Sequence, residues 1–304
     1  MSGAAFEGQT LRGRGRVVNY ANLVKLPHTL FALPFALVGV TLASYEHPVS
    51  PLDLLLILVA FTSARFAAMG FNRIVDREID ARNPRTRTRE IPSGKLSLAD
   101  AWTAVVVAST LFITSAALLN RVCLLLAPFA LAWILLYSYT KRFTRSAHLV
   151  LGAGLAIAPV GAFLAVAGEW SDPAAILVVL AGAVLCWVAG FDILYSLQDV
   201  EFDRAEGLHS IPAALGVRGA LVVSRGLHAL CAGLFFALGV LMPPLGVLYL
   251  VGAAVIAAML VYEQSLVRAD DFSRVDAAFF NVNGAISVGF FLLVLAERLL
   301  WTRG

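Results

Sequence analysis

The chain has 304 residues, of which 60% are hydrophobic and 14% are charged, and its mean hydropathy is +0.82. An average soluble domain has about 45–50% apolar and about 25% charged residues, so this composition excludes a soluble globular enzyme. The net charge is +3, and the three cysteines lie inside apolar segments without a CxxC spacing, which argues against disulfides or a cysteine metal site.

Nine apolar segments follow one another along the chain, and each is long enough to cross a bilayer. They cover residues 21–43, 52–71, 101–119, 122–139, 147–166, 174–197, 222–241, 245–262 and 277–300. Residues 1–18 contain three arginines but no apolar run, and we interpret them as a basic cytoplasmic segment rather than a signal peptide. We therefore expect a single all-α, polytopic membrane domain over residues 1–304, with about nine transmembrane helices.

The distribution of basic residues predicts the orientation of these helices. Most lysines and arginines lie before the first apolar segment or in the connections after the second, fourth, sixth and eighth segments. The opposite side carries only Arg121, Arg298 and Arg303. Because cytoplasmic loops are enriched in Lys and Arg, we expect a multi-pass protein of the bacterial inner membrane whose charged loops face the cytoplasm.

A first acidic segment ends the second apolar segment. Asn72, Asp76 and Asp80 are spaced four residues apart, which in a continuous helix places their side chains on one face, about 6 Å apart along the axis. Arg65 lies two turns before Asn72 on the same face. A guanidinium inside an apolar helix is costly unless it is paired or solvated, so we expect Arg65 to bind a carboxylate or a phosphate in the same site.

A basic loop follows directly, over residues 82–95. Arginine forks suit diphosphate oxygens, and we interpret this loop as a lid in which Arg85 and Arg89 contact such a group. Contact with anionic lipid headgroups is the alternative interpretation. Lys141, at the end of the fourth apolar segment, and Tyr137, one turn before it, are further candidates that could also be interface anchors.

A second acidic segment ends the sixth apolar segment. Asp192, Tyr195, Asp199 and Asp203 share one helix face by the same spacing rule. The segment repeats the first at one constant offset, with Asp76 matching Asp199, which hints at an internal duplication. Two such sets on the same membrane side favour a functional site over helix-end charges that merely pair with neighbouring arginines.

The donor types of both segments point to a hard cation. Carboxylate and amide oxygens suit Mg²⁺, which proteins commonly hold with one or two carboxylates together with substrate phosphate oxygens. We therefore predict Mg²⁺ as the cofactor, bound with a diphosphate. The predicted metal ligands are Asn72, Asp76, Asp80, Asp199 and Asp203.

Other functional classes have weaker support. The histidines show no metal-ligand spacing, and we find no phosphate-binding glycine loop, nucleophile elbow or basic-aromatic pattern for nucleic acid. We expect neither nucleic acid nor an obligate protein partner. A transporter would place its ion site near the bilayer midplane on broken helices, whereas these acids lie at helix ends in segments that the sequence predicts to be continuous.

With these motifs the chain resembles the UbiA superfamily of intramembrane aromatic prenyltransferases. The family pattern NDxxDxxxD, followed by a loop of the form RTxxRPLPSG, is similar to Asn72…Asp76…Asp80 and residues 85–94. The second motif is similar to the 192–203 segment, and a Tyr-Pro-x-x-Lys-Arg pattern is similar to residues 137–142. An arginine before the first motif in 4-hydroxybenzoate members matches Arg65. The chain departs from the pattern at Arg73, Glu90 and His209, where the family commonly has Asp, Pro and Lys.

This resemblance implies nine helices around a central cavity and a specific reaction. The reaction is Mg²⁺-dependent transfer of a polyprenyl group from a polyprenyl diphosphate to a ring carbon of 4-hydroxybenzoate, in quinone biosynthesis, with the isoprenoid tail in the lipid bilayer. The same chemistry on 1,4-dihydroxy-6-naphthoate, for menaquinone, is the alternative small aromatic acceptor. Haem farnesylation and chlorophyll esterification are further alternatives within the family.

The resemblance also implies roles for individual residues. Asp199 is the carboxylate expected near the acceptor hydroxyl. The expected catalytic residues are Asp76, Asp80, Tyr195, Asp199 and Asp203, and the expected substrate-binding residues are Arg65, Asn72, Arg85, Arg89, Tyr137, Lys141 and Asp192.

Overall fold

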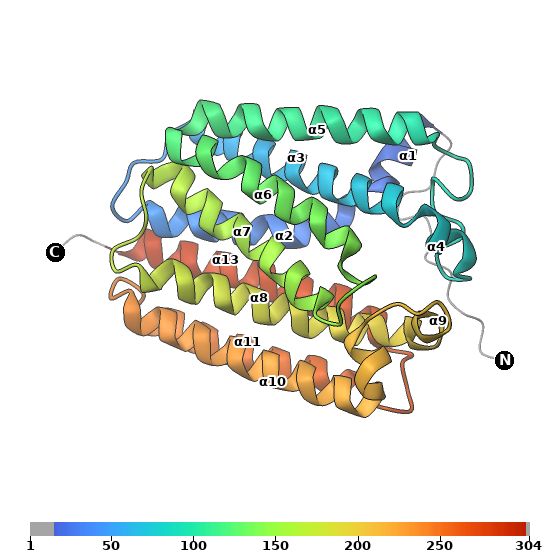
Figure 1. The fold of residues 1–304 in the computed structure, drawn as a ribbon. Coiled ribbons are helices and arrows are strands. Elements are labelled where there is room, and N and C mark those ends of the chain that lie inside the picture. The colour runs from blue at the N-terminus through green and yellow to red at the C-terminus, as the bar shows by residue number, and fades with distance from the viewer. Residues whose placement is uncertain (1–14, 302–304) are drawn as a thin grey trace.

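The computed structural model describes residues 15–301, without the side chains of 26–31, 277 and 279. The predicted N-terminal segment 1–18 therefore lies mostly outside the described residues. Every regular element within the described range is a helix (Figure 1). In chain order these are α1 (Arg16–Leu23), α2 (Leu26–Ala43), α3 (Pro51–Val75), α4 (Arg77–Arg82), α5 (Leu98–Leu119), α6 (Arg121–Thr140), α7 (Ala147–Ala167), α8 (Ala175–Ser196), the 3-10 turn η1 (Leu197–Asp199), α9 (Val200–Ala205), α10 (Ile211–Leu241), α11 (Val247–Leu266), α12 (Val275–Ala277), the π-helical turn η2 (Ala278–Val282) and α13 (Asn283–Leu300).

The transmembrane helices agree with the predicted apolar segments. Within the described residues, eight helices are long and apolar enough to cross a membrane: α3, α5, α6, α7, α8, α10, α11 and α13. The remaining predicted span, the first, corresponds to α2, which contains the shorter apolar stretch Ala32–Ala43. Large apolar side chains such as Phe129 and Val240 are exposed on the outside of the bundle, which suits contact with lipid.

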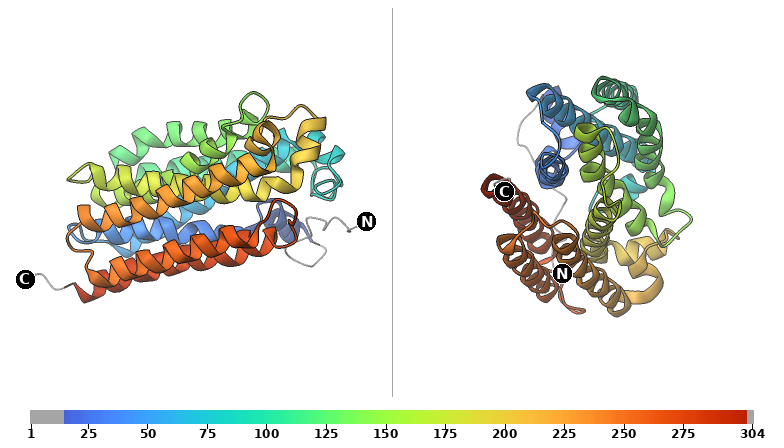
Figure 2. Two further views of the ribbon diagram at one scale, coloured as in Figure 1. Left: turned by 90° about the horizontal axis from the view of Figure 1, so that it is seen from below. Right: turned by 90° about the vertical axis from the view of Figure 1, so that its left-hand side faces the viewer.

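The long helices lie side by side and form a ring when viewed along the bundle axis (Figure 2). α7 packs between α2 and α8, α8 packs against α10, and α2 packs against α13, so the first and last spans are neighbours. Aromatic rings from three of these helices meet in the core: the ring centroids of Phe35 and Trp187 are 4.6 Å apart, and those of Phe35 and Phe290 are 5.6 Å apart.

The expectation of continuous helices through both acidic segments is wrong. α3 ends at Val75, Asp76 has non-helical backbone angles, and α4 then begins in a new direction. α8 ends at Ser196, and η1 and α9 follow. Both breaks lie at the same end of the bundle, where polar α4 and α9 turn away from the transmembrane direction (Figure 1). The turn keeps their charged residues out of the apolar layer.

Two other predicted boundaries also differ from the structure. The first apolar segment is divided between α1 and α2 at Lys25, which has a left-handed backbone conformation with φ of 47°. α10 begins at Ile211 rather than at residue 222, because the Ser210 side chain accepts a hydrogen bond from the Ala213 N–H and so caps an additional first section of the helix. That section ends at a kink, where Gly216 has φ of 71°.

Candidate active site

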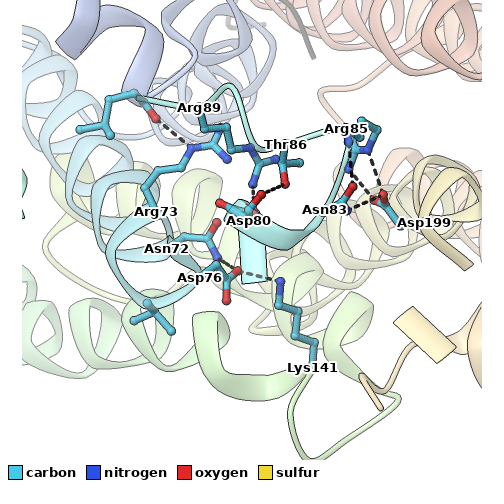
Figure 3. Close-up of polar contacts among 12 residues, drawn as sticks. Asn72, Arg73, Asp76, Asp80, Asn83, Arg85, Thr86, Arg89, Lys141 and Asp199 are labelled. Carbon is cyan, nitrogen blue, oxygen red and sulfur yellow. Dashed lines mark hydrogen bonds and ion pairs between the residues drawn. The ribbon is translucent and has the colours of Figure 1, made fainter. Parts of the chain in front are cut away.

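The predicted site residues gather at the end of the bundle that carries α4, α9 and the basic loop (Figures 1 and 3). In the structure this loop covers residues 83–96, because Arg82 is the last residue of α4. The end of α3 and α4 supply the first acidic segment. The end of α8, with η1 and α9, supplies the second. The end of α6 supplies a cationic pair, Lys141 and Arg142.

Asp76 is buried between two cations and an amide. Its carboxylate lies 2.7 Å from the Lys141 Nζ and 3.3 Å from the Arg142 guanidinium, and it accepts a hydrogen bond of 3.1 Å from Asn72 (Figure 3). Arg142 also donates to the Val75 carbonyl, at 2.7 Å. Val75 is the last residue of α3. The basic residues at the end of α6 therefore contact both the C-terminal end of α3 and Asp76, the residue that follows it.

Asp80 is buried under the basic loop. One oxygen, Oδ1, accepts a hydrogen bond of 2.7 Å from Arg89, and its backbone carbonyl accepts one of 3.1 Å from the Thr86 hydroxyl. Burial alone would raise the pKa of Asp80, but the charges of Arg89 and Arg73 outweigh burial and hold that pKa below its ordinary value. Within the described residues, the other oxygen, Oδ2, is buried without a hydrogen-bond partner.

Asp199 is held by the basic loop from across the site. Arg85 donates to both carboxylate oxygens, at 2.9 Å from Nε and through a very short contact from Nη2, and Asn83 donates at 3.1 Å. Arg85 also donates to the Tyr195 hydroxyl, at 3.0 Å, and lies over the Tyr195 ring. Burial would lower the pKa of Arg85, but the hydrogen bonds and charge of Asp199 raise it above its ordinary value.

These contacts bring the two acidic segments together. Asn83 and Arg85 directly follow the first segment and bind Asp199 of the second. Arg82 adds an ion pair of 2.7 Å with Glu206 near the end of α9. The 83–96 loop therefore connects the two acidic segments in space, although they are far apart in the sequence (Figure 3).

The remaining predicted residues lie around this cluster. Asp203 is on α9, one turn beyond Asp199, and Tyr137 is on α6, one turn before Lys141. Arg65 is on α3 and Asp192 is on α8, each two turns before the acidic cluster and so deeper in the bundle. Asp192 contacts His148 of α7 rather than the basic loop, at 2.7 Å.

Three residues of the site were not among the predicted site residues. Arg142 directly follows Lys141 in the sequence, so the prediction for Lys141 could have been extended to it. Asn83 could have been found as the polar residue that ends the first acidic segment. His148 had no sequence signal, because its proximity to Asp192 depends on how α7 packs against α8.

The acids suit a hard divalent cation by their chemistry, although the cations that hold them keep them apart. Within the described residues, no three His, Cys, Asp or Glu side chains are grouped closely enough to hold a metal ion. The donors at the site are carboxylate and amide oxygens, and within the described residues Asp80 Oδ2 is a buried carboxylate oxygen without a hydrogen-bond partner. The assignment of Asn72, Asp76, Asp80, Asp199 and Asp203 as Mg²⁺ ligands therefore stays a prediction.

The structure is thus a bundle of long apolar helices with two acidic segments and a cationic loop at one end, the architecture of a membrane protein with a charged site at one face. Residues 32–292 match the UbiA prenyltransferase family. The chain belongs to this family, and it is a prenyltransferase and an integral multi-pass membrane protein.

Known relatives cover nearly the whole chain. The chain is 31% identical over 272 residues to 4-hydroxybenzoate octaprenyltransferase of Nitrosospira multiformis, an alignment that covers 88% of this chain and 91% of the relative. The apo structure of a UbiA homolog from Aeropyrum pernix K1 has 37% identity and a TM-score of 0.79, covering 90% of this chain and 97% of that one. A UbiA homolog from Archaeoglobus fulgidus, bound to DMAPP and Mg²⁺, shares the fold with a TM-score of 0.73 at 21% identity, covering 93% of this chain and all of that one.

Proposed function

We propose that this protein transfers a polyprenyl group from a polyprenyl diphosphate to a ring carbon of 4-hydroxybenzoate in a Mg²⁺-dependent reaction at the cytoplasmic face of the membrane. The observation that carries the proposal is the cluster of acids and cations in which Lys141, Arg85 and Arg89 each pair with a different aspartate. The names of relatives about 30% identical over most of their length support the aromatic acceptor.

The cations of the site suit a diphosphate. Arg85 and Arg89 come from the basic loop and Lys141 and Arg142 from the end of α6, and guanidinium groups bind phosphate oxygens in a bidentate manner. Asn72, Asp76, Asp80, Asp199 and Asp203 would hold Mg²⁺, and the cations now paired with these acids would then be available to the phosphate oxygens, so that every charge would keep a partner.

The residues of the chain then support departure of the diphosphate. The carbon–oxygen bond of the donor breaks, and its electron pair leaves with the diphosphate. Bound Mg²⁺ supplies Lewis-acid stabilisation of the negative charge on this leaving group. Arg85, Arg89 and Lys141 add preorganised positive charge, and the Tyr195 ring offers a π face to the allylic cation.

The acceptor completes the reaction deeper in the site. A ring carbon beside the phenolic hydroxyl forms the new carbon–carbon bond and then loses its proton, which restores aromaticity. We assign the acceptor carboxylate to Arg65, two turns before Asn72 on α3, because a guanidinium suits a carboxylate. The polyprenyl tail lies among the spans and passes between them into lipid.

A transfer assay with two acceptors tests the proposal. Membranes containing the protein receive a labelled polyprenyl diphosphate and Mg²⁺, together with 4-hydroxybenzoate or 1,4-dihydroxy-6-naphthoate. We expect a labelled product from 4-hydroxybenzoate. A product only from the naphthoate would show that the acceptor is the naphthoate, and the proposed diphosphate chemistry would stand. No product from either compound would contradict the proposal of an aromatic acceptor.

A further inference from the structure

His148 connects three elements just below the cluster of acids and cations. It lies in the first turn of α7, and its side chain is only 6% exposed. Its Nδ1 is 2.7 Å from Asp192 Oδ2 on α8. Its Nε2 accepts a hydrogen bond of 3.4 Å from the Ile211 N–H, at the first residue of α10.

These two contacts select one tautomer of the neutral ring. A backbone N–H can only donate, so Nε2 must present its lone pair to Ile211. The proton of the neutral ring is then on Nδ1, where it is donated to the Asp192 carboxylate. The start of α10 thereby selects the ring tautomer that holds Asp192 in one orientation.

Asp192 is more accessible than its partner. Its side chain is 22% exposed, against 6% for His148, so part of the Asp192 side chain remains uncovered while the imidazole is buried. Asp192 lies two turns before Asp199, and Arg65 lies two turns before Asn72. The two residues are therefore at similar depth, one on α8 and one on α3, below the place of the diphosphate.

We propose that His148 is a positioning residue that orients Asp192 to accept a hydrogen bond from the hydroxyl of the aromatic acceptor. This proposal rests on the proposed function. It replaces the sequence-based expectation for Asp199, because Arg85 and Asn83 occupy the oxygens of Asp199, and bound Mg²⁺ would occupy them in their place. Asp192 with Arg65 would then recognise a phenol that carries a carboxylate at the far side of its ring.

Steady-state kinetics of three variants test this role. His148→Leu removes the donor, whereas His148→Asn keeps an N–H near the position of Nδ1. We expect His148→Leu to raise KM for the acceptor about tenfold or more, the effect of losing a hydrogen bond to a charged group, with KM for the diphosphate changed less than twofold. His148→Asn should recover most of the loss. His47→Leu, in the α2–α3 connection at the opposite end of the bundle, is the control.

Two results would overturn the proposal. One is an unchanged KM for the acceptor in His148→Leu. The other is an equal rise in both KM values, which would show that His148 affects binding of the diphosphate as much as binding of the acceptor. If His148→Leu does not fold, Asp192→Asn carries the same test, with the same selective rise in KM for the acceptor expected.

The tautomer can be measured without turnover. In the ¹⁵N NMR spectrum of histidine-labelled protein, the signals lost in His148→Asn should show a protonated Nδ1 and an unprotonated Nε2. The opposite tautomer would overturn the proposed orientation of Asp192. If the wild-type protein transfers to no aromatic acceptor but shows the Nδ1–H tautomer, the proposed function and the acceptor role fail together, and the hydrogen-bond geometry stands.

Discussion

Each of the three aspartates Asp76, Asp80 and Asp199 is held by a different cation: Lys141 at the end of α6, and Arg89 and Arg85 in the basic loop. Buried carboxylates are costly without partners, so these pairs let the acids sit at the edge of the apolar layer. The same cations suit phosphate oxygens. The cluster is thus poised to exchange internal ion pairs for a bound metal and diphosphate.

The role of Arg85 gives a test within the basic loop. Its guanidinium binds both oxygens of Asp199, a geometry that a lysine ammonium cannot reproduce. We expect Arg85→Lys to lower kcat/KM for the diphosphate by about tenfold, and Arg85→Ala to lower it further. Steady-state kinetics of purified protein measure this.

Arg87→Ala is the matched control, because Arg87 lies in the same loop and has an exposed side chain. Its kcat/KM should stay within about twofold of wild type. Equal losses in the Arg85 and Arg87 variants would show that only the net charge of the loop matters.

Much of this residue-level picture could be predicted from spacing. The sequence alone shows the acids at intervals of four residues and identifies Arg85, Arg89 and Lys141 as candidate cations. Their pairing is not visible in the sequence, because it depends on where α6 and the loop meet the ends of α3 and α8. Arg142 and His148 join the site only through that packing.

At the scale of elements, the apolar pattern predicted the spans well and their ends less well. Residues 77–82 and 200–205 are good helix formers, so nothing in their composition predicts that α4 and α9 leave the line of α3 and α8. The breaks follow from contacts made at Asp76 and Asp199 by other elements. Tertiary contacts thus override a locally helical sequence.

Close packing of α7 against α8 gives a second prediction. A Cβ on Gly152 would lie 2.5 Å from the Leu185 carbonyl oxygen, a backbone atom that cannot turn away. We expect Gly152→Ala to destabilise the bundle by about 1–3 kcal/mol through overpacking. Unfolding in detergent, followed by circular dichroism, measures this.

Gly161 provides the control on the same helix. A Cβ there meets no atom within 4 Å, so Gly161→Ala should be neutral or stabilising by up to about 1 kcal/mol. Similar destabilisation in both variants would show that helix flexibility, rather than the α7–α8 contact, determines the effect.

At the scale of the whole molecule, we propose that the acid–cation cluster lies on the cytoplasmic side of the membrane. The basic residues concentrate at the end of the bundle with α4 and α9, as the positive-inside rule requires for a cytoplasmic face. Lys95 is exposed in the basic loop, and Glu46 is exposed at the opposite end.

Cysteine labelling tests this orientation. In a chain without its native cysteines, Lys95→Cys should react with an impermeant thiol reagent only when the inner face of the membrane is accessible. Glu46→Cys should react from outside in intact cells. The reverse pattern would contradict the cytoplasmic site.

The central claim is that the two acidic segments form one Mg²⁺-dependent diphosphate site. The most direct test is a double-mutant cycle on the Kd of an unreactive polyprenyl diphosphate analogue, with Asp76→Asn, Asp199→Asn and the double variant, with and without Mg²⁺. We predict that each single variant weakens binding at least tenfold only when Mg²⁺ is present. The double variant should lose clearly less than the product of the two effects, since both residues serve one site. Fully multiplicative losses, or binding that is independent of Mg²⁺ and of both acids, would contradict the account.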